Sequence, residues 1–428
     1  MAGADDDGAP KSGATEEPPQ RSGVRALLAN RRYAFYLASR VLLIIATQML
    51  SVAVGWQVYE ITGKALALGF SGLALFLPGF LLALPGGHVA DRRDRRKIIL
   101  VCHLGVATCA TILAVMAFQG WHRLLPIYVV LGLLGTIRAF SGPAGQALMP
   151  NLVERKDLER AVALGSSSWQ LAMIAGPSIG GALYAATGRA AVVYSVCAVL
   201  AVTAFGCVFA IGNPPAAAEV RKKERATWST LLAGLRYVWS NKPILGSISL
   251  DLFAVLLGGA VALLPIFARD LLHIGPWGLG ILRSAPAIGA STVAFSLANF
   301  PLRRRAGIVM LACVLIFGIA TIVFGLSESF ALSLVALLVL GAADMISVVV
   351  RSTLIQTRTP DEMRGRVGAV NMVFIGASNE LGEFESGVTA AWLGPRIAVL
   401  VGGIGTCLVV AVWSVLFPDL RKIDRLDE

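Results

Sequence analysis

The stretch that decides the fold is residues 66–97, which read LALGFSGLALFLPGFLLALPGGHVADRRDRRK. A long apolar run leads directly into a loop that carries five positive charges. About 20 apolar residues in a row are enough to cross a bilayer as a helix. This stretch therefore predicts a membrane span with a basic loop at one end, and the rest of the chain repeats the pattern.

Twelve apolar runs of this kind follow one another along the chain. The predicted spans are 35–60, 66–90, 98–118, 124–146, 164–186, 190–211, 245–268, 278–299, 307–326, 329–350, 367–392 and 395–416. The bilayer core offers no hydrogen-bond partner to the backbone, so each run is predicted to be a helix. The predicted fold class is an all-α polytopic membrane protein with 12 transmembrane helices.

The composition supports this prediction and narrows the function. Hydrophobic residues make up 56% of the chain and charged residues only 15%, which is outside the range of soluble globular proteins. Most of the 37 lysines and arginines lie in the termini and in alternate loops, which predicts that both termini are cytoplasmic. Positive charge in short loops beside spans suits anionic lipid headgroups, so no nucleic-acid partner is expected from the net charge of +11.

Motifs for catalysis and for ATP hydrolysis are missing from the sequence. It contains no phosphate-binding Gly-x-x-x-x-Gly-Lys-Ser/Thr loop and no HExxH element. The six cysteines fall within predicted spans without a CxxC pair, and the four histidines are scattered. We therefore expect no enzyme activity, no cofactor and no metal site.

The chain divides into two related halves. Shifting the sequence by 206 positions aligns Gly135 with Gly341, Gly176 with Gly382, and Gly181 with Gly387. Such matches indicate a duplicated six-span unit, and shared glycines predict close helix–helix contacts. The predicted domains are a disordered cytoplasmic tail at 1–24, a six-helix bundle at 25–211, a cytoplasmic linker at 212–244, a second bundle at 245–418 and a cytoplasmic tail at 419–428. The linker is predicted to hold an amphipathic helix, either in the membrane interface or packed on the loops.

The loop after the second span carries a motif. Gly87, Asp91, Arg92, Arg95 and Arg96 form the pattern Gly-x-x-x-Asp-Arg-x-x-Arg-Arg. From the spacing we expect the glycine to admit a neighbouring helix, the aspartate to meet a helix N-terminus, and the arginines to reach carboxylates on adjacent loops. The loop resembles the signature of the major facilitator superfamily. That resemblance implies two pseudo-symmetric six-helix bundles and a latch between them on the cytoplasmic side.

The fifth span supplies a second motif. Gly176, Pro177, Gly180 and Gly181 resemble the core of the motif that marks exporters (antiporters) in the superfamily, although a structural kink alone would explain the proline. The segments 56–63, 141–150, 359–367 and 379–387 resemble the enterobactin-exporter and macrolide-efflux branch of drug:proton antiporters. The resemblance covers residues 25 to 425.

Ionisable residues inside the spans are costly, so each is a candidate for proton or substrate coupling. These candidates are Arg40, Arg138, Asp251, Asp344, Glu380, Glu383 and Glu385. Arg138 and Asp344 align at the 206 shift, and we expect either a pair across a central cavity or two residues without contact. Glu383 ranks first for protons because it lies near the predicted membrane centre. Arg40 either reaches the membrane surface or faces the cavity, where it would favour an anionic or catecholate-like substrate.

The predicted function is secondary active transport, with proton-coupled export of a small molecule such as a siderophore or drug by alternating access. The resemblance implies a bacterial plasma (inner) membrane. The expected partners are the small-molecule substrate, protons and membrane lipids, with an outer-envelope channel left open, and the monomer is expected to function. Multidrug or macrolide efflux and metabolite import by the same fold remain as alternatives.

Overall fold

The computed structural model describes residues 24–212, 228–300 and 304–424, and within these ranges it contains helices and no strand. Each predicted span falls on a helix, although the second and seventh are broken into shorter segments. The helices are α2 (Arg31–Thr62), α3 (Ala65–Leu81) with α4 (Ala83–Arg92), α5 (Arg95–Phe118), α6 (Leu124–Leu148), α7 (Leu158–Thr187), α8 (Ala190–Ala210), α10 (Lys242–Leu257), α12 (Gly275–Asn299), α13 (Ala306–Leu326), α14 (Phe330–Arg358), α15 (Asp361–Leu393) and α16 (Pro395–Leu416). The all-α prediction is confirmed.

The helices differ in how apolar they are. Among the described residues, nine helices are long and apolar enough to cross a membrane, and α3 with α4, bent by 48°, makes a tenth span. The other two predicted spans are α7, which is rich in serine and glycine, and α15, which carries three glutamates in its second half. Both pack against helices of the other half of the molecule. Helices covered in this way by protein need not be apolar on every side.

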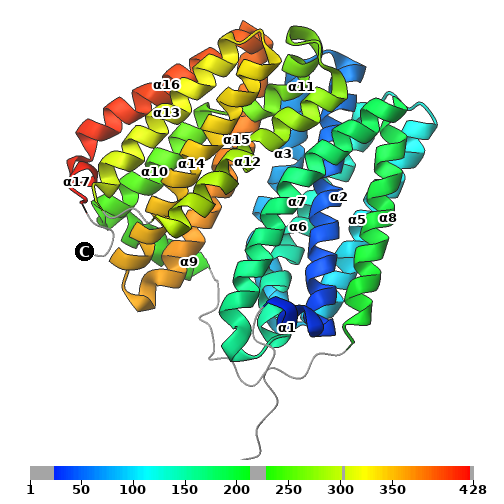
Figure 1. The fold of residues 1–428 in the computed structure, drawn as a ribbon, viewed down its shortest axis with the longest axis horizontal. Coiled ribbons are helices and arrows are strands. Elements are labelled where there is room, and N and C mark those ends of the chain that lie inside the picture. The colour runs from blue at the N-terminus through cyan, green and yellow to red at the C-terminus, as the bar shows by residue number, and fades with distance from the viewer. Residues whose placement is uncertain (1–23, 213–227, 301–303, 425–428) are drawn as a thin grey trace, which may run out of the picture.

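The two halves repeat one packing scheme. In the N-terminal half, α2 packs on α7 and α8, and α6 packs on α3 and α5. In the C-terminal half, α10 packs in the same way on α15 and α16, and α14 on α12 and α13. The halves lie closest at the end that carries the short helix α11 (Leu264–Ile266) and separate toward the end of α1 (Val24–Ala29) and α9 (Trp228–Ser240) (Figure 1).

The shared glycines mark close contacts, as predicted. An added Cβ at Gly135 would lie 2.0 Å from the carbonyl oxygen of Leu75, and one at Gly341 would lie 2.0 Å from that of Pro286. The first contact joins α6 to α3, and the second joins α14 to α12, their counterparts in the other half. Equivalent positions therefore make equivalent contacts, which supports the duplication.

Two further glycine contacts join the halves to each other. At the crossing of α7 and α12, a Cβ on Gly181 would lie 2.8 Å from the Cα of Gly280. At the crossing of α15 and α3, a Cβ on Gly387 would lie 2.7 Å from the Cα of Gly69. We call these two contacts the glycine crossings. Since backbone meets backbone at both crossings, the two halves are closed at the end of the molecule that carries α11.

The seventh span is broken in its middle. Helix α10 ends at Leu257, and Gly258 and Gly259 lead into a 3-10 turn (Ala260–Leu263), α11 and a π-helical turn (Phe267–Leu271). Gly259 lies against α15, where a Cβ would be 2.6 Å from the Gly382 carbonyl oxygen. The second part of this span, residues 260–271, can therefore take a direction different from α10.

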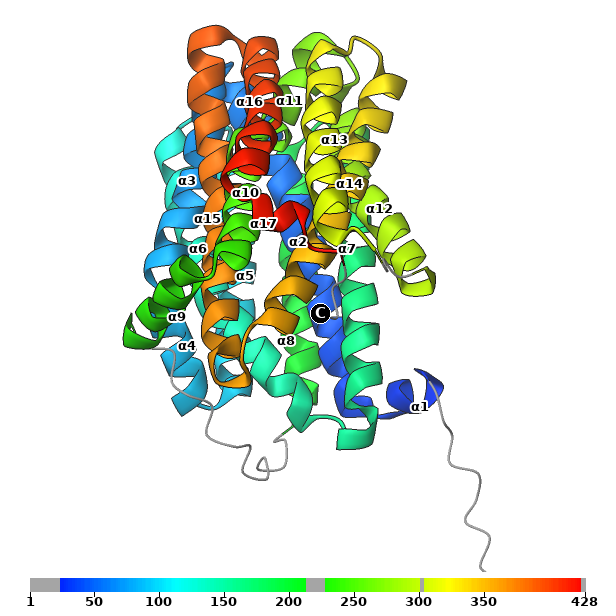
Figure 2. The same ribbon diagram turned by 90° about the vertical axis from the view of Figure 1, so that its left-hand side faces the viewer.

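The segments outside the spans are packed in part. Helix α9 lies beside α15 (Figure 2). Val238 of α9 is buried, and Tyr237 donates a hydrogen bond to the Arg358 carbonyl oxygen at 3.2 Å. The predicted C-terminal tail is packed as far as Asp424, because Leu420 in the short helix α17 (Pro418–Arg421) and Ile423 just after it are buried. Most of the predicted N-terminal tail, linker residues 213–227 and residues 425–428 lie outside the described residues.

Candidate substrate cavity and its charged residues

A cavity of about 520 Å³ lies between the halves and is lined mainly by the N-terminal one. Its walls come from α2, α3, α5, α6 and α7, and the C-terminal half adds Ala262, Pro265, Arg283 and Glu383. Pockets for small ligands have volumes of roughly 300–1,000 Å³. The cavity therefore has the size and the position of a transport site.

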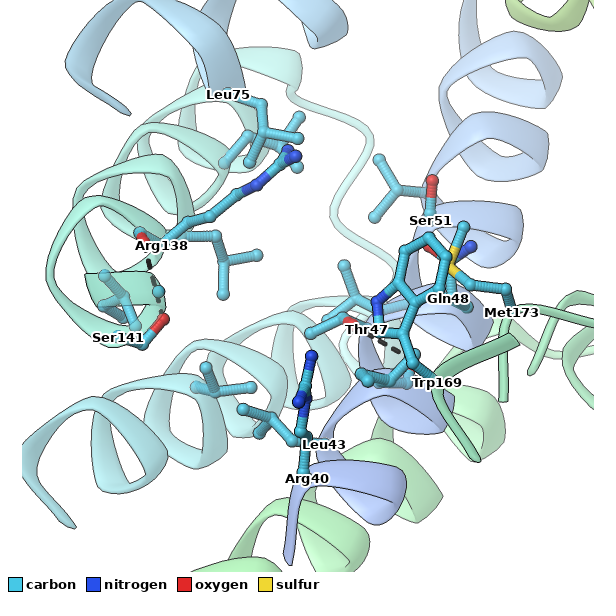
Figure 3. Close-up of a pocket in the computed structure, with 18 of the residues that line it drawn as sticks. Arg40, Leu43, Thr47, Gln48, Ser51, Leu75, Arg138, Ser141, Trp169 and Met173 are labelled. Carbon is cyan, nitrogen blue, oxygen red and sulfur yellow. Dashed lines mark hydrogen bonds between the residues drawn. The ribbon is translucent and has the colours of Figure 1, made fainter. Parts of the chain in front are cut away.

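Two arginines project into this cavity from different helices (Figure 3). Arg40 on α2 lines it, which decides between the two placements left open by the sequence. Arg138 on α6 keeps 71% of its side chain exposed while its Nη1 lies 2.9 Å from Oε1 of Glu380 on α15. An ion pair that is open on one side is weakly held and can exchange partners.

Of the two alternatives for Arg138 and Asp344, the described residues fit the second, because no ion pair joins these two side chains. Arg138 pairs with Glu380 instead, and this ion pair joins α6 to α15 rather than to α14. Asp344 instead lines a small separate cavity with Asp251. The 206-residue alignment correctly put both residues on equivalent helices. It could not show whether the two side chains meet, because that depends on how each half packs.

The glutamates of α15 point in different directions. Glu383 lines the cavity, and its Oε2 would be 2.8 Å from a Cβ on Gly72 of α3. Glu385 lies outside the cavity lining and accepts a hydrogen bond from Thr389 at 2.7 Å within its own helix. From α12 in the C-terminal half, Arg283 donates a hydrogen bond to the Ser51 hydroxyl at 2.8 Å. The cavity thus contains three guanidinium groups and the carboxylates of Glu383 and, beside Arg138, Glu380.

A second charged group is sealed inside the C-terminal half. Arg351 on α14 forms an ion pair with Asp251 on α10, and Arg351 is only 2% exposed. The sequence reading missed Arg351 because the predicted span ended at residue 350, one position earlier. Ion pairs buried to this extent are strongly coupled to the packing of the helices that carry them.

The signature loop holds the N-terminal half together. Arg95 donates to the Ala147 carbonyl oxygen at 3.0 Å, and Arg96 donates to those of Val208 and Phe209 at 3.1 and 2.7 Å. These bonds tie the loop to the carbonyl ends of α6 and α8, where a cation is favoured. The contacts described for Arg95 and Arg96 are therefore with helix ends, and the contacts with carboxylates on adjacent loops stay a prediction.

Gly87 of the signature loop does not make the close helix contact that the sequence predicted. A Cβ on Gly87 would meet nothing within 4 Å, whereas one on Gly86 would lie 2.3 Å from the Ala139 carbonyl oxygen. The neighbouring glycine therefore admits the close helix. Asp91 and Arg92 are exposed at the end of α4, and Asp94 caps α5 by accepting from the backbone N–H groups of the two residues that follow Arg95.

The exporter-type motif packs on two helices. Gly176 and Gly180 of α7 face α2, where added Cβ atoms would lie 2.5 Å from Gln48 and 2.8 Å from Met49. Gly181 belongs to the crossing with α12, and the carbonyl oxygen of Pro177 approaches Gly280 there. The motif therefore joins the cavity helix α2 to the other half of the molecule.

A polar clamp closes the same end as the glycine crossings. The Tyr59 hydroxyl at the end of α2 donates to the Asp270 carboxylate on the broken seventh span. The Arg269 guanidinium lies over the Tyr59 ring, 5.7 Å from its centroid. Because Tyr59 and Asp270 belong to different halves, this clamp must open if the halves separate at this end.

Several polar cavity residues were missed in the sequence reading. They include Ser39, Thr47 and Ser51 on α2, His103 on α5 and Trp169 on α7. His103 is buried and bonded to the Ser39 hydroxyl at 2.9 Å. The signal was present as polar residues at helical spacing on one face of α2.

Comparisons with known proteins agree with this geometry. The enterobactin exporter of Citrobacter koseri is 28% identical over 396 residues, covering 91% of this chain and 92% of that protein. The enterobactin exporter of Shigella boydii is 28% identical over 395 residues with the same coverage. Both alignments run through both halves, so the likeness concerns the whole transporter and not one bundle.

Solved structures show the same fold at low identity. The nucleoside transporter NupG has a TM-score of 0.69 at 15% identity, covering 90% of this chain and 99% of that one. A bacterial homologue of the iron transporter ferroportin, in an inward-facing state, has a TM-score of 0.69 at 15% identity, covering 91% and 98%. At this identity the likeness supports the fold alone.

The family model for transmembrane secretion effectors matches residues 25–428, nearly the whole chain. Its relatives are transporters and not enzymes, and the apolar helices make the chain a multi-pass protein of the bacterial inner membrane. The two bundles, the cavity between them and this match lead to one conclusion: the chain belongs to the transmembrane secretion effector family of the major facilitator superfamily.

Proposed function

We propose that the chain exports an anionic, siderophore-like small molecule across the bacterial inner membrane by alternating access. The observation that carries the proposal is the cavity into which Arg40 and Arg138 project between the two halves. Guanidinium groups in a partly dry cavity favour carboxylates and catecholates over cations. The names of the relatives, enterobactin exporters, support the same substrate class.

Binding would proceed by exchange of counter-ions. Glu380 neutralises Arg138, which stays largely exposed. An arriving anion takes the place of Glu380 at little cost, since an exposed ion pair contributes about 0–1 kcal/mol. Releasing Glu380 on α15 would loosen one link between the halves and so favour their movement.

The described state would receive substrate from the cytoplasm. The glycine crossings and the Tyr59–Asp270 clamp close one end, while the halves diverge toward the end that carries α1 and α9. With both termini cytoplasmic, as the positive charges predict, the open end faces inward. Export would follow when the halves close at the cytoplasmic end and separate at the outer end, driven by proton entry. The monomer would suffice for this cycle. An outer-envelope channel would receive the exported molecule.

The proposal is tested in a strain that lacks its own enterobactin exporter and expresses this chain. Arg40→Gln and Arg138→Gln should each lower enterobactin release at least tenfold at unchanged membrane protein level. Arg123→Gln, an exposed arginine just before α6, is the matched control and should release it normally. Normal release by both cavity variants would overturn the anionic substrate class.

A second candidate function has one observation in its favour. Trp169 and Met173 line the cavity beside the arginines, and such side chains suit apolar drugs such as macrolides. Increased macrolide tolerance of the same strain, with no enterobactin release, would support multidrug efflux instead. Macrolide tolerance that survives Arg40→Gln would show that the apolar wall binds the drug.

A further inference from the structure

A small cavity in the C-terminal half lies apart from the substrate cavity. Asp251 and Ala254 of α10, Val314 and Phe317 of α13, and Asp344 and Ser347 of α14 line it together with Val255. Its free volume is about 10 Å³, room for about one water molecule. Apart from the two carboxylates and the Ser347 hydroxyl, apolar side chains enclose it.

The charges around this cavity do not balance. Asp344 and Arg351 lie seven residues apart on α14 and therefore share a face, and Asp251 pairs with Arg351 from α10. Two carboxylates beside one guanidinium leave one net negative charge. The Nε of Arg351 is buried without a hydrogen-bond partner among the described residues, so the ion pair with Asp251 leaves part of the donor capacity of this arginine unused.

Among the described residues, α13 and α12 supply no further cation to this cluster. Helix α13 has no charged residue from Ala306 to Leu326, and its one ionisable side chain is Cys313, beside Val314. Arg283 of α12 faces the substrate cavity, where it bonds Ser51. The carboxylates of α15 that lie near a cation, Glu380 and Glu383, belong to that cavity with Arg138.

We propose that Asp344, held beside the Asp251–Arg351 ion pair, is the proton-binding site of this transporter, separate from the substrate cavity. The inference rests on the proposed export function and adds where the driving ion binds. A proton adds to a carboxylate oxygen of Asp344 as an O–H bond and removes the excess negative charge, and it leaves to water on the other side of the membrane. A metal ion would need several more oxygen ligands than this apolar cavity offers.

The cluster is connected to the substrate cavity through the broken span. Asp251 lies two helical turns before the break at Gly258 and Gly259. Beyond the break, Ala262 and Pro265 line the substrate cavity and Asp270 closes the outer clamp. A change of charge that moves α10 against α14 would therefore act on the closed end of the transporter through residues 260–271.

The first test reads proton binding without any substrate. Purified full-length protein in lipid nanodiscs is examined by infrared difference spectroscopy between acidic and alkaline buffer, which detects the C=O stretch of protonated carboxyl groups. Asp344→Asn should remove a band that Glu383→Gln and Glu328→Gln keep. A band that persists in Asp344→Asn, or that disappears in Glu383→Gln, would overturn the assignment.

The second test separates coupling from transport, with enterobactin as the probe in proteoliposomes. Asp344→Asn should exchange enterobactin across the membrane within twofold of the unsubstituted protein while losing at least tenfold of its proton-driven accumulation. Glu328→Gln should keep both. Proton-driven accumulation retained by Asp344→Asn would overturn the inference. If the unsubstituted protein moves no enterobactin in either mode, the proposed function fails, and the infrared band still decides the proton site.

Discussion

The two halves share one helix arrangement but use charge in opposite ways. In the N-terminal half Arg138 is 71% exposed and its ion pair reaches across to the other half. In the C-terminal half Arg351 is 2% exposed and its ion pair stays within the half. The glycine contacts repeat between the halves, so the backbone scaffold is symmetric while the chemistry is not. One half supplies an open cavity, and the other a sealed charged cluster.

The largest expected difference between the halves is in stability. Arg351→Gln leaves Asp251 buried without a partner, which should cost about 3–5 kcal/mol. Arg138→Gln removes a pair whose arginine is 71% exposed and whose glutamate is 14% exposed, so the loss should be smaller than that of Arg351→Gln. The measurement is the apparent unfolding temperature of each purified variant in detergent.

A double substitution sharpens this prediction. Asp251→Asn combined with Arg351→Gln removes both charges, so it should recover part of the stability lost by Arg351→Gln alone, because no unpaired buried charge remains. Equal losses of stability for Arg351→Gln and Arg138→Gln would show that the two ion pairs are buried to the same degree, and this would contradict the difference between the halves.

The symmetric part of the comparison is tested at the glycine crossings. Gly181→Ala and Gly387→Ala each place a Cβ against backbone of the other half, which should cost about 1–3 kcal/mol in overpacking. The two losses should be alike because the positions are equivalent. Thermal unfolding is measured again, together with enterobactin release from cells.

Gly206→Ala is the matched control, since a Cβ there meets nothing within 4 Å in α8. It should leave stability unchanged or raise it slightly, because alanine favours a helix more than glycine does. A loss at one crossing only would mean that the two contacts differ in function despite their equal geometry.

The smallest expected effect is on substrate affinity and concerns the ion pair of Arg138 and Glu380. Glu380→Gln removes the carboxylate that competes for Arg138, so enterobactin should bind up to about fivefold more tightly for a competing pair worth up to ~1 kcal/mol. Quenching of tryptophan fluorescence, with Trp169 in the cavity, reports the affinity. Glu385→Gln, outside the cavity, should leave the affinity unchanged, and a weaker affinity for Glu380→Gln would contradict counter-ion exchange.

The signature loop shows what a local pattern can and cannot predict. The motif predicted arginines that reach carboxylates, where Arg95 and Arg96 bond carbonyl ends of helices, and it assigned the close helix contact to Gly87 where Gly86 makes it. Adjacent residues on a helix point about 100° apart. A motif therefore identifies the turn of the helix, and the packing of α6 decides which residue faces it.

Ion-pair partners were the least predictable feature of the site. Arg138 and Asp344 align in the duplicated sequence, yet Arg138 pairs with Glu380 and Asp344 lies beside Asp251. Arg351 was overlooked because a predicted span ended one residue too early, within the usual uncertainty of helix ends. Long side chains reach partners on any helix nearby, so their pairing depends on distances that no single helix contains.

The amino-acid sequence by itself determined the spans, their all-helical character, the duplication and the glycines at which helices meet. Each of these follows from a local rule, because lipid forces backbone groups to bond within the helix and a close crossing requires a small residue. Only the tertiary structure decided which charges face the substrate cavity and which are sealed in the C-terminal half. Those choices depend on how the helices are rotated and which neighbours surround them, and that follows from the packing of all the helices together.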